Sequence, residues 1–154
     1  MRDGIFHRSG MLYGASNGQF MAVDGTCYRI KFFATWNSQN ARPFSPGRDK
    51  IELIAEDPIS AKSQWNIGLP VVARSIIALK DRLVLAGAPC VVVPEDPWRN
   101  FDGRGEGRLE IRSRLDGSLL KEYKLSATPV HDGVSAANEA LFISMKNGTV
   151  QCWR

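Results

Sequence analysis

Four carboxylates crowd one short stretch of the chain and are the first candidates for chemistry. They are Glu95, Asp96, Asp102 and Glu106, within the segment E-D-P-W-R-N-F-D-G-R-G-E-G-R. Carboxylate oxygens are the ligands that calcium prefers. The spacing matches no standard calcium-binding loop, however, and Arg99, Arg104 and Arg108 neutralise the charge. We therefore interpret the stretch as a solvated loop and assign no metal ligand to it.

Neither histidine lies in a recognisable catalytic pattern. His131 precedes Asp132-Gly133 in a predicted turn, and His7 lies close to the start of the sequence. No serine or cysteine is placed near either one in a known nucleophile motif. The sequence therefore predicts structural or exposed histidines and no catalytic residue.

A glycine-rich stretch, G-R-G-E-G from Gly103 to Gly107, has the outward form of a phosphate-binding loop. It lacks the Lys-Ser/Thr of that motif and precedes a predicted strand, so no helix N-terminus would face an anion. We assign no cofactor-binding residue to it.

The cysteines and tryptophans also have plain structural interpretations. Cys27, Cys90 and Cys152 lack the C-x-x-C spacing of a zinc or redox site, and their apolar neighbours predict buried free thiols. The four tryptophans offer flat surfaces to a ligand, but packing between strands is the more common use of such residues. They are Trp36, Trp65, Trp98 and Trp153.

Composition indicates a soluble globular chain. Its 154 residues are 44% hydrophobic and 23% charged, which predicts one domain over 1–154. The net charge of +4 comes from 20 basic and 16 acidic residues spread along the chain, so no basic stripe predicts nucleic-acid binding. No run has the length of a signal peptide or a bilayer span. We expect no membrane partner; the compartment stays undecided, with the cell envelope or periplasm open for longer relatives.

The spacing of apolar residues along the chain is that of strands. A first hairpin is expected around Asp24-Gly25, with its second strand over Cys27–Phe33. Further short strands, joined by turns rich in Asp, Asn and Gly, are expected in pairs and in a final group of three. Their expected ranges are Ser75–Leu79, Leu83–Ala86, Leu109–Arg114, Leu119–Leu125, Val134–Ala137, Ala140–Ser144 and Thr149–Trp153.

Helical spacing is almost absent. The best candidate, Ile59–Gln64, is a single turn long, so the sequence predicts an all-β sandwich, barrel or propeller. Proline and glycine interrupt the pattern near 35–50 and over 88–108, and both stretches are expected to be loops between strands. Binding would use such loops more often than the strands.

An internal repeat favours the propeller among these three architectures. Aligning Leu83 with Leu141, an offset of 58 residues, places Ile76 on Val134, and the turn Lys80-Asp81 falls on Asn138-Glu139. A weaker echo lies over 9–25. Strand-turn-strand repeats of this kind are typical of propeller blades.

The chain resembles the C-terminal part of PQQ-binding-like β-propeller repeat proteins, in the quinoprotein alcohol dehydrogenase-like superfamily, of the type abundant in planctomycete bacteria. The motifs that carry the resemblance are W-N-I-G-L-P-V-V-A-R-S-I-I-A-L-K-D-R-L-V-L-A-G-A-P, E-D-P-W-R-N-F-D-G-R-G-E-G, and the run from Leu115 to Trp153 that contains V-H-D-G-V-S-A-A-N-E-A-L-F-I-S-M. It covers Gln19 to Trp153, and it implies four-stranded antiparallel blades around an axis.

The resemblance also implies an incomplete ring. A closed propeller needs about four to eight blades, whereas this chain carries about three, the third incomplete. Leu141 and Ile143 would face one neighbouring sheet and Phe142 the other. The outer blades would expose apolar faces and unpaired strand edges, which predicts a protein partner or self-association.

Quinone chemistry is less well supported by the residues. Quinoproteins of the superfamily hold PQQ with calcium, a stacking tryptophan and often a disulfide between adjacent cysteines, and no Cys-Cys pair occurs here. Their blade motif A-x-D-x-x-T-G-K-x-x-W has its nearest match in R-S-R-L-D-G-S-L-L-K, where Lys121 falls at the tryptophan position. We therefore prefer a non-catalytic interaction or assembly module without a cofactor. The alternative is a fragment of a PQQ-dependent oxidoreductase whose active residues lie in N-terminal blades.

Overall fold

The structure is a computed structural model that describes residues 20–31, 49–60 and 62–154. Every regular element among these residues is a β-strand, and there are eleven of them. The chain divides into two compact units, residues 1–69 and 70–154, which are described separately. The all-β class expected from the sequence is confirmed, and the expectation of a single domain over 1–154 stays a prediction.

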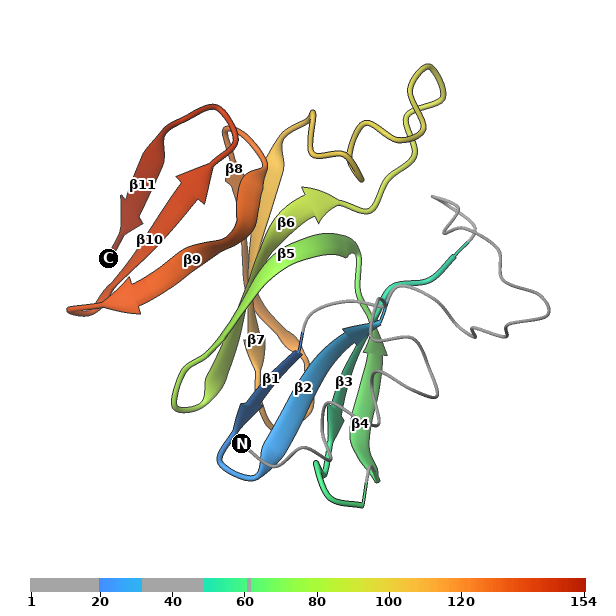
Figure 1. Ribbon diagram of the computed structural model, residues 1–154, viewed down its shortest axis with the longest axis vertical. Helices are drawn as coiled ribbons and strands as arrows, with labels where there is room; N and C mark the ends of the chain where they lie inside the picture. Colours follow the sequence, from blue (N-terminus) through green and yellow to red (C-terminus); the bar gives the residue numbers. More distant parts are fainter. Residues whose placement is uncertain (1–19, 32–48, 61) are drawn as a thin grey trace. The chain divides into compact units, whose positions relative to one another are not determined.

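The first unit contains one four-stranded antiparallel sheet in the order β1-β2-β3-β4 (Figure 1). Its strands are β1 (Phe20–Val23), β2 (Thr26–Lys31), β3 (Glu52–Glu56) and β4 (Ser63–Gly68). Asp24 and Gly25, with φ of 49° and 75°, form the expected first turn. Each strand pairs with the next along the chain, which is the simplest antiparallel connection.

Of the segment Ile59–Gln64, in which the sequence predicted a single helical turn, the described residues 59–60 and 62–64 are not helical. Asp57 Oδ1 accepts hydrogen bonds from the backbone N–H groups of Ile59 and Ser60, at 3.0 and 2.6 Å, so the chain reverses at that point. β4 follows, and its Trp65 packs against Tyr28 of β2 with ring centroids 5.9 Å apart. Local side-chain hydrogen bonds of this kind compete with helix formation.

The second unit contains two antiparallel sheets (Figure 1). The first has the order β5-β6-β7-β8 and the second the order β11-β10-β9. Their strands are β5 (Val71–Ala78), β6 (Arg82–Pro89), β7 (Gly107–Ser113), β8 (Leu119–Leu125), β9 (Pro129–Ala137), β10 (Ala140–Met145) and β11 (Val150–Trp153). Two four-stranded sheets and one three-stranded sheet follow one another along the chain, so the expected blades with an incomplete third are confirmed.

The strand pairing reproduces the sequence repeat. In the β5–β6 hairpin Ile76 lies opposite Leu85, and in the β9–β10 hairpin Val134 lies opposite Ile143. Each residue of the second pair is 58 positions after its counterpart in the first. The β1–β2 hairpin pairs Phe20 with Arg29 at the same distance from its turn. The repeat is therefore a repeat of backbone register as well as of residue type.

Two strands, β5 and β9, begin well before the start that the sequence pattern predicts. β5 starts at Val71, because the run Val71–Ile76 is buried on both faces of the strand and so shows no alternation of apolar and polar residues. β9 starts at Pro129, a position where proline removes no ladder hydrogen bond.

The core of the second unit lies between its two sheets. Buried aliphatic side chains from both sheets meet there, and β9 runs beside β5. The members of this core are Val84, Ala86, Leu109, Leu125, Val134, Ile143 and Met145. Gly87 of β6 lies opposite Ala73 of β5, where a Cβ atom would come within 2.1 Å of the Val72 carbonyl oxygen, so only glycine fits. The described residues hold no helix with the length and hydropathy of a membrane span.

Candidate binding groove

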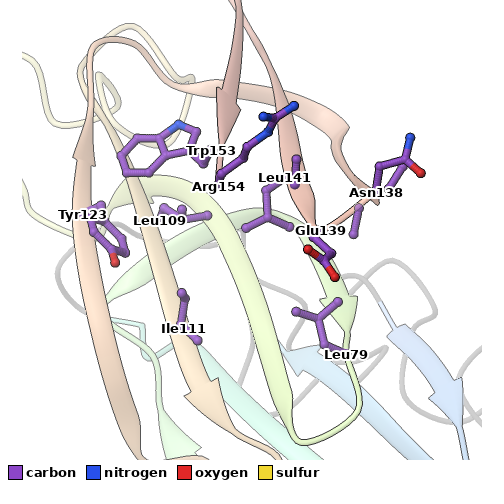
Figure 2. Close-up of a pocket in the computed structure, with 12 residues that line it drawn as sticks. Leu79, Leu109, Ile111, Tyr123, Asn138, Glu139, Leu141, Trp153 and Arg154 are labelled. Carbon is purple, nitrogen blue, oxygen red and sulfur yellow. The ribbon is translucent and has the colours of Figure 1, made fainter.

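An apolar groove of about 480 Å³ opens between the two sheets of the second unit (Figure 2). We call it the intersheet groove. Its lining comes from β7, β8 and the β5–β6 turn on one side and from the β9–β10 hairpin and the end of β11 on the other. The lining residues are Leu79, Leu109, Ile111, Tyr123, Ala136, Ala137, Asn138, Glu139, Ala140, Leu141, Trp153 and Arg154.

Strand alternation explains why the walls are apolar. Leu109 and Ile111 stand two residues apart on β7 and so share one face of the sheet, and Tyr123 lies opposite Leu109 on β8. From the other sheet, Leu141 of β10 lies opposite Trp153 of β11. Figure 2 shows these side chains directed into the same space.

An aromatic pair joins the two walls. The rings of Tyr123 and Trp153 meet edge to face, with centroids 5.0 Å apart and planes at 66°. Trp153 Nε1 donates to Gln151 Oε1 at 3.1 Å, and Gln151 Nε2 donates to Ser126 Oγ at 3.0 Å. The indole is therefore held in orientation by a hydrogen bond as well as by ring packing.

The rim of the groove carries polar residues in an unfavourable backbone conformation. Asn138 and Glu139 form the two-residue turn between β9 and β10, with φ of 50° and 60°. Asparagine tolerates this left-handed region, whereas glutamate adopts it only at a cost of about 1 kcal/mol. Figure 2 places the Glu139 side chain near Leu79 and Leu141.

Beside the groove, β11 presents an open strand edge. Met145 N donates to the Thr149 carbonyl at 2.9 Å, so residues 145 and 149 form a hydrogen-bonded pair at the start of the hairpin. Because such pairs alternate along an antiparallel ladder, Gln151 and Trp153 bond to β10. The backbone groups of Val150 and Cys152 then point away from β10, and no strand among the described residues pairs with them.

The acidic stretch at 95–106 is a folded loop between β6 and β7. Arg104 binds both Asp96 and Asp102, and its Nη2 lies 3.0 Å from Asp102 Oδ2. Lys146 Nζ donates to the Asp102 carbonyl oxygen at 2.8 Å, and Arg74 Nη2 to that of Phe101 at 2.9 Å. The loop is thus attached to the sheets that flank it.

Two of the four loop carboxylates, Asp96 and Asp102, are therefore paired with an arginine. Among the described residues, no three His, Cys, Asp or Glu side chains are grouped as metal ligands would be. Glu95 and Glu106, the other two acids of the loop, are exposed. The stretch G-R-G-E-G leads into strand β7, as expected.

His131 lies within strand β9 and not in the turn that the sequence predicted, and it is exposed. Partial burial lowers its pKa, and the nearby charge of Arg74 lowers it further. No Ser or Cys partner for it is evident among the described contacts, and His7 lies outside the described residues.

One expectation about the cysteines is wrong. Cys27 is buried and Cys90 is half-buried, but Cys152 is exposed because it lies on the face of β11 turned away from the groove. Burial raises the pKa of both the Cys27 and the Cys90 thiols. The aromatic neighbour Trp153 misled the prediction, since adjacent strand residues point to opposite faces.

The described tryptophans have different structural roles. Trp65 packs within the first sheet and Trp153 lines the groove, whereas Trp98 stands on the 90–106 loop, 40% exposed, edge to face with Phe101. Trp36 lies outside the described residues. Packing between strands therefore accounts for Trp65, but Trp98 is a loop residue.

Sequence analysis missed a buried charged cluster on β7. Glu110 is fully buried, with its carboxylate 2.9 Å from Arg108 Nε and 2.7 Å from Arg112 Nε. Arg112 Nη1 also donates to the Gly117 carbonyl oxygen at 2.9 Å, which ties the cluster to the β7–β8 turn. The alternation R-L-E-I-R at 108–112 was the available signal, and the cluster is structural.

Comparison with known proteins gives likeness of fold only. No protein-family profile matches the sequence, and no curated protein matches it. Among solved structures, the chain is similar to the computationally designed Ika4 protein, with 12% identity and a TM-score of 0.54 over 87% of this chain. It is also similar to BamB from Moraxella catarrhalis, with 11% identity and a TM-score of 0.49 over 89% of this chain. The chain spans 62% of the Ika4 protein and 42% of BamB.

Proposed function

We propose that this chain is a non-catalytic propeller-type repeat module that binds a protein partner at the intersheet groove. The observation that carries the proposal is the open edge of β11 beside an apolar groove. Apolar concave surfaces with a few polar groups at the rim are typical of binding sites, and an unpaired strand edge is a template for another chain.

The apolar lining of the groove favours a protein partner over a small polar ligand. Its walls are aliphatic and aromatic and include the Tyr123–Trp153 pair, and aromatic residues are enriched at the anchor points of protein interfaces. The polar side chains that line it, Asn138, Glu139 and Arg154, lie at its rim. A partner with apolar side chains would gain the most from this arrangement.

The described residues do not fit the quinone cofactor that the family resemblance implies. Lys121, which falls where the blade motif has tryptophan, is exposed on β8, and a lysine offers no flat surface to stack on. The carboxylates Asp96 and Asp102 are both bound to Arg104, which competes with a cation for them. We therefore derive no step through PQQ.

Site-specific photo-crosslinking in the producing cell tests partner binding. A benzophenone amino acid replaces Tyr123 in the groove, and the control carries it at Leu115, an 87% exposed turn residue. The proposal expects a discrete protein adduct from position 123 that disappears when Leu141→Glu adds a charge to the groove wall. Equal adducts from both positions, or none from position 123, would count against it.

An activity assay tests the absence of catalysis. The purified chain is supplied with PQQ, calcium and alcohols or sugars. We expect no quinone-dependent dehydrogenation, and measurable turnover would favour the alternative of a quinoprotein-like oxidoreductase fragment.

A further inference from the structure

Among the residues that the structure describes, the third sheet has one strand fewer than the two sheets that precede it, although its first two strands repeat the register of β5 and β6. We propose that the partner supplies the missing strand: an extended segment that pairs antiparallel with β11 and places an apolar side chain in the intersheet groove. This inference rests on the proposed function and specifies the chemistry of the partner.

The backbone of β11 provides the hydrogen bonds for such pairing. The N–H and C=O groups of Val150 and Cys152 point away from β10, and by the same alternation those of Arg154 do so too. Val150 is 65% exposed, and Cys152 and Arg154 are exposed as well. An added strand of about five residues would satisfy these groups, as in other cases of strand addition to a sheet edge.

Alternation also determines which side chains of the added strand face the groove and which face solvent. Residues opposite Gln151 and Trp153 would share their face, which is the face turned towards β8 and the groove. Residues opposite Val150 and Cys152 would share the exposed face with Phe142, which is 36% exposed. The partner segment is therefore apolar at the position that meets Trp153 and polar at the neighbouring positions.

Strand number favours a single segment over a second copy of this chain. The β5–β8 sheet has one strand more than the sheet packed on it, and Tyr123 of β8 is half-buried beneath the end of β11. Two copies joined by their β11 edges would each bring their own β7 and β8 to the same side of the joined sheet. These strands would overlap, whereas one added strand covers β8 without conflict.

The chain itself supplies a probe for the experiment. β8 already holds the fourth position in its own sheet, so the segment 118–126, S-L-L-K-E-Y-K-L-S, has the composition of a fourth strand. Appending Asn-Gly and this segment after Arg154 gives a hairpin turn followed by a strand, with the pairing made intramolecular. The measurements are thermal unfolding and amide hydrogen exchange at residues 150–153.

We expect the appended strand to raise the unfolding midpoint by about 3–6 °C and to slow exchange at Val150 and Cys152 at least tenfold. Val150→Pro removes an outward N–H without affecting the β10 ladder, so it should cancel both effects and leave the unextended chain as stable as before. Val150→Thr keeps the N–H and is the matched control that should retain both effects.

Each other outcome overturns strand addition. The proposal fails if the appended strand raises neither the unfolding midpoint nor the protection of the β11 amides, or if it raises the midpoint as much with Val150→Pro as with Val150→Thr. It also fails if light scattering shows that the unextended chain is a dimer that the appended strand dissociates. Photo-crosslinking at position 123 that is blocked by Leu141→Glu but unaffected by Val150→Pro would leave the groove as the partner site while rejecting strand addition.

Discussion

Tyr123 and Trp153 meet edge to face with ring centroids 5.0 Å apart, and this pair joins the outermost strand of one sheet to the last strand of the next. The two residues are 30 positions apart and lie on strands that share no hydrogen-bond ladder. The contact therefore links the stability of the second unit to the shape of the groove.

Trp153→Ala should destabilise the second unit. The change removes a half-buried indole and an aromatic pair, which together contribute about 2 kcal/mol to the free energy of unfolding. Trp153→Phe keeps a ring against Tyr123 and should lose less than half as much. Urea denaturation measures both, and equal stability of the wild type and Trp153→Ala would contradict this role.

Glu139→Gly should stabilise the protein by about 1 kcal/mol, because glycine adopts the left-handed conformation of this turn without steric cost. Gly148→Ala, at φ of 84° in the next turn, is the reciprocal control and should destabilise by a similar amount. Both are read from thermal unfolding. A loss of stability in Glu139→Gly would show that contacts of the Glu139 side chain stabilise the protein by more than its backbone conformation destabilises it.

The three thiols should react at different rates. At pH 8 a small alkylating reagent should modify Cys152 first, because it is exposed, while burial and the raised pKa slow the reaction of Cys27 and Cys90. Mass spectrometry of partly labelled protein gives the order, and Cys152→Ser should abolish the fast phase. Rapid labelling of Cys27 in the folded protein would contradict the described burial.

Stability should fall as pH drops from about 7 to 5, in part because of His131. Partial burial and then Arg74 lower its pKa in the folded state, so the unfolded chain binds more protons in this range. The contribution is present above the unfolded pKa and is lost as pH falls through the lowered folded pKa. His131→Asn should flatten the decline, as measured by urea denaturation at both pH values, and an unchanged slope would argue against it.

Much of the fold follows from local sequence, because alternation and turn residues act over a few positions. Asp24-Gly25 and Asn138-Glu139 marked two hairpins, and the offset of 58 between Leu83 and Leu141 predicted matching registers that the structure confirms. The start of β5 at Val71 was missed, since a strand buried on both faces carries no alternation.

The groove was much harder to predict than the strands. Its walls come from Leu109 and Tyr123 in one sheet and from Leu141 and Trp153 in another, and no local spacing relates these residues. The sequence instead indicated charged loop residues such as Asp96 and Asp102 as candidates, and their carboxylates form ion pairs with Arg104. Composition shows where charge lies, but only the pairing of sheets shows which apolar residues share a cavity.

Amide hydrogen exchange of the free protein along β11 tests the central claim, that this strand is an open edge, most directly. We predict fast exchange at Val150 and Cys152, whose N–H groups point away from β10, and slow exchange at Gln151 and Trp153, whose N–H groups bond to it. Similar protection at all four amides would show that the edge is already paired and would contradict the account.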